Sequence, residues 1–421
     1  MRLILPRYRR LKHTYLVERE QWVRVGGAEE VTTRPRAVVV DGVPIVVLRM
    51  HDGGPPVAFP DHCPHRLVPL SAATLDQGVL RCAYHGWEFA ADGTCVAVPS
   101  LGDASSIPPR ARLTGAPVKE EDGAVWVQRP DDGADPVDLA SNVDEELQRA
   151  WHPLALASEL PVEATLLGRT WTVDQNLDVT PKPYAVQERW GLVWIAPEEP
   201  LVDLFEEPDA EDRDFVGAWL PPSVTNASAA FVADNFLDVA HFPFVHAGTF
   251  GAGEETFVPP YEITEDGREV RSVQVQWFDN PEDPGVVEGV RPVRQRRRAT
   301  YVYRVPFQLL LRLEELDAGA VKTILFFAQP QTLTSTRVYT KMLLKGIGGV
   351  ERPGPDVVAA EVAFEEAVLA EDLALHAKTR LPGLPLVPRD ELHVRADRLG
   401  VALRRQLRTF RRDYLDGLAA R

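Results

Sequence analysis

The sequence predicts an α+β protein, with an all-β domain at the N-terminus followed by a domain of helices packed on an antiparallel sheet. Its 421 residues suffice for two or three domains with a sizeable core. The stretches TYVYRVPFQLLLRLEEL and VKTILFFAQPQTLTSTRVYTKMLLK begin at Thr300 and Val321, and both are rich in β-branched and aromatic residues, as long antiparallel strands are. Residues 355–380 carry apolar side chains at three-to-four spacing, which predicts a long helix after those strands.

The composition disfavours several classes of function. A formal net charge of −16 opposes the binding of nucleic acid or of an anionic membrane across the whole surface. The chain has neither a secretory signal nor a run of about 18 apolar residues, so we expect a cytoplasmic protein outside the membrane. The basic runs at 7–13 and 291–298 suit either an acidic protein partner or an ordinary solvated surface. Three cysteines cannot build a disulfide framework, and a reducing compartment leaves thiols free for metal binding or catalysis.

Two mixed pairs of metal-binding residues lie in the N-terminal part. Cys63-x-His65 is followed by sixteen residues and then by Cys82-x-x-His85, so that each pair can lie on one tight turn. A zinc site of two cysteines and two histidines usually keeps like residues together, whereas here each pair is mixed. Mixed pairs suit an iron–sulfur cluster with two different irons, one bound by the two thiolates and one by the two imidazoles.

The stretches CPHR and CAYHGWEF, which contain these pairs, resemble the cluster-binding signature of the Rieske non-haem iron oxygenases. The resemblance implies a [2Fe–2S] cluster held by Cys63, His65, Cys82 and His85. Cys95 lies outside both pairs, and we interpret it as a small buried residue rather than a ligand.

An electron donor requires an acceptor, and the stretch DNFLDVAHFPFVH from Asp234 offers one. Asp238 and His241 are three residues apart and therefore neighbours on one face of a predicted helix, with Asn235 one step before them. Pro243 is expected to break or kink that helix, which lets His246 reach the same metal. Two histidines and one carboxylate with open positions form the Fe(II) site of non-haem oxygenases.

The spacing N-x2-D-x2-H-x4-H is similar to the mononuclear iron motif of the same family. The resemblance implies that His241 and His246 are iron ligands. It also implies that Asp238 accepts a hydrogen bond from a ligand histidine and connects the iron to His85 in the cluster of a neighbouring subunit. Asn235 is expected near the metal, without a firm role as a ligand.

The third iron ligand should be a carboxylate further along the chain. On the helix predicted at 355–380, Asp372 lies at the margin of the apolar face. The family places an aspartate on a late helix of this kind, so we expect Asp372 to complete the triad. Glu365 and Glu371, on the same part of the helix, remain alternatives.

Two segments of the chain look like copies of one another. Residues 116–127 and 184–195 share a valine, a glutamate, a glycine, a valine and a tryptophan at a constant offset of 68. We therefore expect 150–198 to be a shortened Rieske-like β unit without a cluster; the alternative is that sheet strands simply resemble one another. The expected organisation is a Rieske domain at 1–135, a linker at 136–149, the possible degenerate unit at 150–198 and an iron-containing catalytic domain of helix-grip fold at 199–421.

The resemblance is closest to the vanillate and dicamba O-demethylase branch and implies the terminal oxygenase component, or α subunit, of such a system. The chain has no nucleotide-binding fingerprint, so electrons are expected from an external ferredoxin or flavin reductase. With O2, the enzyme would hydroxylate or oxidatively dealkylate a small, apolar or aromatic substrate. Alternatives on the same iron are cis-dihydroxylation, desaturation and oxidative ring closure; a pure electron carrier is a further alternative. The family also implies a homotrimer. Side chains expected around the substrate include Phe307, Phe326 and Phe327, although core packing explains the same residues equally well.

Overall fold

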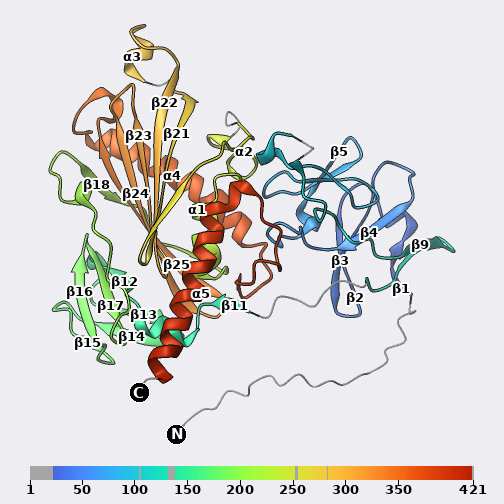
Figure 1. Cartoon of the computed structure of the whole chain (residues 1–421), viewed down its shortest axis with the longest axis horizontal. Helices are drawn as coiled ribbons and strands as arrows, with labels where there is room; N and C mark the ends of the chain where they lie inside the picture. The colour runs from blue at the N-terminus through green and yellow to red at the C-terminus, as the bar shows by residue number, and fades with distance from the viewer. Residues whose placement is uncertain (1–21, 104–105, 131–137, 252–254, 282, 420–421) are drawn as a thin grey trace.

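The computed structural model describes residues 22–103, 106–130, 138–251, 255–281 and 283–419. Figure 1 shows two parts, a smaller β-rich lobe formed by the N-terminal residues and a larger lobe built around one long sheet. Helices α1 and α2 lie where the two lobes meet. This is the predicted α+β fold, with an all-β part first and a part of sheet and helices after it.

The N-terminal lobe contains three small antiparallel sheets, with strand orders β1–β10–β9, β2–β3–β4 and β5–β6–β7–β8. The first cysteine–histidine pair follows β4, and the second lies between β6 and β7. Short strands here are joined by turns whose glycines take left-handed backbone angles, such as Gly78 between β5 and β6. The strands are β1 Val23–Gly27, β2 Arg36–Val40, β3 Val43–Arg49, β4 Pro56–Pro60, β5 Thr74–Asp76, β6 Val79–Arg81, β7 Glu88–Phe89, β8 Cys95–Ala97, β9 Val118–Glu121 and β10 Ala124–Val127.

The larger lobe is organised by an eight-stranded antiparallel sheet of order β18–β25–β24–β23–β22–β21–β20, in which β19 also pairs with β25. The runs that the sequence marks as strands form its centre, β22 to β25. The strands are β18 Val216–Trp219, β19 Ser223–Thr225, β20 Ile263–Asp266, β21 Glu269–Asp279, β22 Arg294–Arg304, β23 Gln308–Glu315, β24 Val321–Thr332 and β25 Ser335–Lys345.

Helix α4, Pro355–His376, crosses one face of this sheet (Figure 1). Lys322 of β24 fixes it there by pairing with Glu361 and by lying over the ring of Phe364. Helix α5, Arg398–Ala419, packs against α1, Ala229–Leu237, and along β21 through a buried apolar stripe. The remaining helices are the short α2, Phe242–Val245, and α3, Pro284–Val287.

Residues 150–198 form two sheets of their own and, among the described residues, contribute no strand to the eight-stranded sheet. Their orders, β12–β17–β16 and β13–β14–β15, repeat those of β1–β10–β9 and β2–β3–β4. The first strand of each set carries a bulge at the same place, after Arg24 and after Pro153. The strands are β12 His152–Leu156, β13 Val162–Leu166, β14 Arg169–Val173, β15 Val179–Thr180, β16 Ala185–Arg189 and β17 Leu192–Ala196.

The segment expected to be a linker is partly tied to the larger lobe. Leu139–Ser141, strand β11, pairs with β26 at Gly383–Pro385, and a short 3-10 helix follows at Glu145–Arg149. The sequence did not indicate this strand, because three residues carry no clear alternation of apolar and polar side chains.

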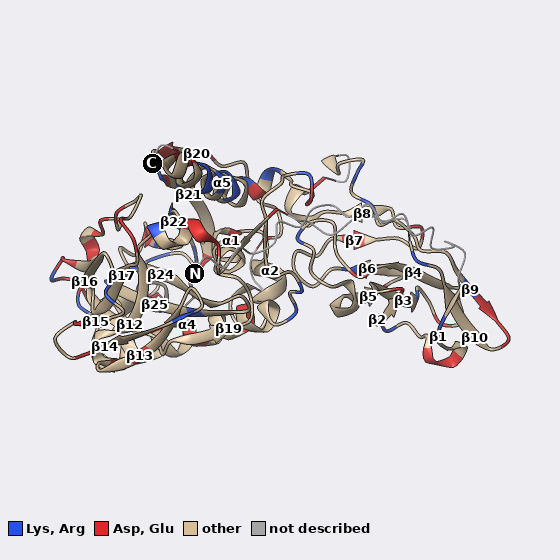
Figure 2. Ribbon diagram, turned by 90° about the horizontal axis from the view of Figure 1, so that it is seen from below, with Lys and Arg blue, Asp and Glu red and all other residues tan. Residues whose placement is uncertain are grey.

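No helix among the described residues is long and apolar enough to cross a membrane. Charged residues of both signs are spread along the ribbon in Figure 2, with acidic residues at the free end of the N-terminal lobe around β1 and β9 and basic ones on α5. The basic run at 291–298 is largely paired within the chain, for example Arg291 with Asp283 and Arg296 with Asp317. The run at 7–13 lies outside the described residues.

Candidate active site

The two cysteine–histidine pairs meet in the interior of the N-terminal lobe. Cys63, His65, Cys82 and His85 are all buried, with at most 2% of each side chain exposed. The Nδ1 atoms of the two histidines face one another at 3.0 Å. Burial, with the neighbouring Cys82 adding to it, raises the pKa of the Cys63 thiol. Two thiols and two imidazoles gathered without a cation are what a metal cluster would satisfy, so these residues fit a [2Fe–2S] group.

Carboxylates hold the outer nitrogens of both cluster-side histidines. His85 Nε2 donates to Asp238 Oδ2 at 2.9 Å, and His65 Nε2 lies 3.0 Å from Asp397 Oδ1. Such bonds fix the tautomer of a metal-binding imidazole and leave Nδ1 as the ligand atom. Asp397 is 332 residues from His65 in sequence and belongs to no motif, so no sequence signal indicates it.

The segment that carries the second metal motif is not one continuous helix, which corrects the predicted geometry. Helix α1 ends at Leu237, and Asp238 already has extended backbone angles. Its Oδ1 accepts the backbone N–H of Ala240 at 2.7 Å, a local bond that competes with the helix. Pro243 therefore does not break a helix; it lies in the first turn of α2, a position that tolerates proline.

His241 and His246 lie at the two ends of α2, and Asp372 of α4 reaches both. The Nε2 atoms of the two histidines are 3.0 Å apart. Asp372 Oδ1 lies 3.6 Å from Nε2 of His241 and 3.5 Å from Nε2 of His246. The three ligand atoms form a compact group that could hold one metal ion. Glu365 and Glu371 are not in this group among the described residues.

The electrostatics of this triad also fit a bound cation. Asp372 Oδ1 is buried without a hydrogen-bond partner. Burial raises the pKa of Asp372 to about 6 against the opposing effect of His241. Burial and the neighbouring His241 lower the pKa of His246 to about 4, partly offset by Glu371. Two neutral imidazoles and a buried carboxylate are the donor set of a non-haem Fe(II) site.

Asp238 connects the two groups of ligands. Besides accepting from His85, its Oδ1 lies 3.7 Å from His241 Nδ1. Burial alone would raise the pKa of Asp238, but His85 and His241 hold it well below its usual value. Asp238 therefore lies between the two groups of ligands and accepts from His85, whereas His241 Nδ1 has no hydrogen-bond partner among the described residues. The resemblance implied a contact with the cluster of a neighbouring subunit, and here both contacts of Asp238 lie within one chain.

Asn235 lies in a second hydrogen-bonded path between the lobes. Its amide nitrogen donates to the hydroxyl of Tyr84 at 3.1 Å, and its oxygen accepts from His376 Nε2 at 2.8 Å. The Tyr84 ring packs 3.8 Å from the ring of His85 and 5.8 Å from that of His241. Sequence reasoning missed Tyr84 and His376, although Tyr84 lies inside the second cluster motif.

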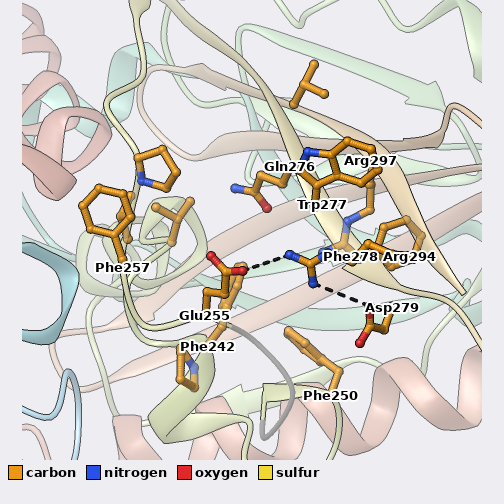
Figure 3. Close-up of a pocket in the computed structure, with 15 residues that line it drawn as sticks. Phe242, Phe250, Glu255, Phe257, Gln276, Trp277, Phe278, Asp279, Arg294 and Arg297 are labelled. Atoms are coloured by element: carbon orange, nitrogen blue, oxygen red, sulfur yellow. Dashed lines mark hydrogen bonds and ion pairs between the residues drawn. The ribbon is translucent and has the colours of Figure 1, made fainter. Parts of the chain in front are cut away.

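A cavity of about 330 Å³ is shown in Figure 3, and its lining includes Val239, Phe242, Pro243 and Phe250, which lie near His241 and His246 in the sequence. The ring of Phe250 also stacks on that of His246, with 5.1 Å between the ring centroids. The other residues that line the cavity come from the segment 255–259 and from β21 and β22. Aromatic lining side chains face the guanidinium groups of Arg294 and Arg297 across the cavity.

Phe307, Phe326 and Phe327, which fit either substrate contacts or core packing, do not line this cavity. Phe326 stacks on Phe236, and Phe327 packs with Trp194 where the sheet of 150–198 covers the large sheet. Aromatic residues of a long strand serve the core on one face and a site on the other, and composition alone does not separate the two.

Comparison with known proteins agrees with this arrangement. Residues 21–108 match the Rieske [2Fe-2S] domain, and residues 225–413 match the vanillate O-demethylase oxygenase C-terminal domain. The probable methylxanthine N7-demethylase NdmC of Pseudomonas sp. (strain TJI-51) is 32% identical over 244 residues, covering 56% of this chain and 80% of that protein.

Two further relatives cover nearly the whole chain. The methylxanthine N1-demethylase NdmA of Pseudomonas putida is 22% identical over 386 residues, or 92% of this chain and 85% of its own. The crystal structure of dicamba monooxygenase bound to 3,6 dichlorosalicylic acid covers 94% of this chain and 98% of its own, at 15% identity and a TM-score of 0.40. The chain belongs to the Rieske non-haem iron oxygenases, as an oxygenase α subunit that uses a [2Fe–2S] cluster and a mononuclear iron.

Proposed function

We propose that this oxygenase removes a methyl group oxidatively from an uncharged aromatic substrate. When bound, the cluster supplies electrons one at a time and the ferrous ion binds and activates O2. Cys63, His65, Cys82 and His85 would hold the cluster, and His241, His246 and Asp372 would hold the iron. The single observation that carries the proposal is the position of Asp238, a buried carboxylate that accepts from His85 at 2.9 Å and lies 3.7 Å from His241 Nδ1, between the two sites.

The position of Asp238 also argues against a pure electron carrier. A carrier has no use for a second group of two histidines and a carboxylate with converging ligand atoms, nor for a cavity whose lining includes residues near those histidines in the sequence. In oxidative demethylation, one oxygen atom of O2 enters a methyl C–H bond and the other leaves as water, with two electrons and two protons consumed. The hydroxylated methyl group is then released as formaldehyde.

The charge balance of the cavity supports an uncharged substrate. Arg294 pairs with Glu255 at 2.9 Å and with Asp279 at 3.5 Å, and all three line the cavity. Arg297 lies over the ring of Phe278 and opposite Glu315 in the strand register, so its charge is also balanced. No lining cation is therefore left over for a substrate carboxylate.

The remaining walls suit a planar ring. Val239 also lines the cavity. Figure 3 shows Phe242 and Phe257 on the other side of it from Gln276, whose amide is directed into it. An amide both donates and accepts hydrogen bonds, as a neutral heterocycle or amide substrate requires. The relatives named for methylxanthine demethylation act, by their names, on substrates of this chemical kind.

We propose further that an external ferredoxin or flavin reductase supplies the electrons, in the cytoplasm, and that the chain works as a homotrimer. No sheet joins strands of 23–127 to strands beyond 138 among the described residues, so the N-terminal lobe could be exchanged between chains without breaking a strand pairing. In such an exchange, His85 of one chain would meet Asp238 of the next, with the contacts otherwise unchanged.

A matched pair of substrates tests the substrate class. 4-Methoxybenzamide and 4-methoxybenzoate share size and shape and differ in charge. Dithionite-reduced enzyme mixed with O2 in a single turnover should release formaldehyde from the amide, with at least about tenfold less from the carboxylate, because the balanced rim leaves the anion unpaired. Preference for the carboxylate would contradict the neutral-substrate proposal, and absence of formaldehyde from both would contradict demethylation of such rings.

A further inference from the structure

Two consecutive carboxylates of α4 meet the two nitrogens of one ligand histidine. Asp372 Oδ1 lies 3.5 Å from His246 Nε2, and Glu371 Oε2 lies 3.0 Å from His246 Nδ1. Because an ionised carboxylate only accepts hydrogen bonds, Nδ1 must carry the proton, and Nε2 then presents its lone pair to the shared space with His241.

The Glu371 side chain is itself held in place by two further donors. Its Oε2 accepts from Thr249 Oγ1 at 2.8 Å, and its Oε1 accepts from the backbone N–H of Gly248 at 3.1 Å. A Cβ at position 248 would lie 2.5 Å from Oε1, so the carboxylate lies close against the backbone, and a larger residue at 248 would displace it from this position. The carboxylate therefore has one position relative to the loop that follows His246.

We propose that Glu371 is the positioning residue for His246, fixing its tautomer and ring orientation as Asp238 does for His85. The two carboxylates have different surroundings. Asp238 is buried and shared with the cluster-side His85, whereas 23% of the Glu371 side chain is exposed and it touches no residue of the N-terminal lobe in the contacts described. Glu371 thus belongs to the iron site alone, and its loss should leave the cluster unaffected.

The test is the affinity of the mononuclear site for Fe(II), measured by anaerobic titration of protein whose cluster is intact and whose second site has been stripped. Glu371→Ala should weaken Fe(II) binding by about 10–100-fold. Glu371→Gln keeps an acceptor oxygen without its charge, so its loss should be smaller. The visible absorbance of the cluster, unchanged in both variants, would show that the protein is folded.

Two control variants distinguish the positioning of His246 by Glu371 from a role of Glu371 only in holding the loop that follows His246. Thr249→Val removes the hydrogen bond from Thr249 to Glu371 and leaves the hydrogen bond between Glu371 and His246. The Fe(II) affinity of this variant should therefore stay within about threefold of wild type. Glu366→Gln makes the same chemical change on an exposed residue of α4 and should have no effect. Wild-type affinity in Glu371→Ala, or a loss in Thr249→Val equal to that in Glu371→Ala, would overturn the proposal.

Discussion

Asp238 carries three contacts with only two oxygens, to His85, to Ala240 N–H and to His241. It accepts a hydrogen bond from His85 in the cluster site and lies within ion-pair distance of His241 in the iron site. No other carboxylate in the described contacts reaches a ligand histidine of both sites, although the Tyr84 ring packs near both. The role of a bridge therefore falls on a residue that sequence spacing places correctly, although the helix assumed for it ends one residue earlier.

Replacing this charge should uncouple the sites without emptying them. In Asp238→Asn the amide keeps the shape of the side chain but cannot accept as strongly from both imidazoles. We expect single-turnover product formation to fall by about 10–100-fold, with iron content and the EPR signal of the reduced cluster unchanged. Asp234→Asn is not a suitable comparison, since Asp234 pairs with buried Arg404; Asp92→Asn, on an exposed turn, is. Full product formation in Asp238→Asn would contradict the bridging role.

The cysteines and histidines of the two candidate metal sites were within reach of sequence reasoning because each lies in a short motif whose spacing the chemistry restricts, whereas Asp372 was one of several acidic residues on a long helix. Asp397 and Glu371 each contact one of these histidines, but both carboxylates lie far from that histidine in the sequence. Such partners need only an oxygen at the right distance, and many acidic residues could supply it. Only the three-dimensional arrangement selects Glu371 for Nδ1 and Asp372 for Nε2 of the same ring.

The elements of the larger lobe follow their sequence patterns closely where a pattern is long. Strands β24 and β25 and helix α4 lie where apolar periodicity places them. The short pieces do not: β11 and α2 consist of three and four residues, and their positions depend on tertiary contacts. The iron site is built from such short pieces, which explains why its residues were predicted better than its backbone.

The unit formed by 150–198 repeats the strand orders and the bulge of the N-terminal lobe. Between its strands β15 and β16 there is only a short connection, where the N-terminal lobe places both cluster loops between β4 and β9. Its sheet β12–β17–β16 covers the large sheet through a core that includes Trp194, Phe327 and Tyr339. We propose that it is a degenerate copy with a packing role.

The stability of this unit should depend on pH through His152 of β12. The ring is buried, its Nε2 donates to the carbonyl of Leu147 at 2.7 Å, and burial lowers its pKa to about 4. As the pH falls, this histidine binds a proton in the unfolded chain, where its pKa is near 6.5, before it does so in the folded protein. Its contribution to the free energy of unfolding is therefore complete above about pH 6.5 and is lost as the pH falls towards 4.

Between pH 7.5 and pH 5 this histidine should lower the free energy of unfolding by about 2 kcal/mol. His152→Gln keeps a donor and cannot titrate, so urea unfolding of the variant should lack that part of the pH dependence. His51→Gln, at an exposed position, should keep it. Identical pH dependence in wild type and His152→Gln would show that His152 does not titrate as described.

The contacts between the two lobes are charged as well as apolar. Buried Arg66, next to His65, pairs with Asp397 at 3.1 Å and with Asp234 at 3.4 Å. Buried ion pairs of this kind contribute little net stability but penalise any arrangement that leaves one member unpaired. They therefore define one docking position for the cluster beside the iron, either within a chain or between chains.

Mixed oligomers distinguish these two possibilities. One chain carries His246→Ala and the other His85→Ala, each with its own affinity tag, and doubly tagged protein is assayed. In a doubly tagged homotrimer with exchanged lobes, one of the three sites combines an intact cluster with an intact iron site, so about a third of wild-type activity should return. No recovered activity in doubly tagged protein would show that the His85–Asp238 contact stays within one chain.

The central claim is that one chain holds two separate metal sites, each formed by the residues named. Anaerobic iron and sulfide analysis, with EPR of the dithionite-reduced protein, tests it for wild type beside His246→Ala. We expect about three irons and two sulfides per wild-type chain, and about two irons and two sulfides in the variant with an unchanged cluster signal. Only about two irons in wild type after reconstitution with Fe(II) would contradict the claim and favour an electron carrier.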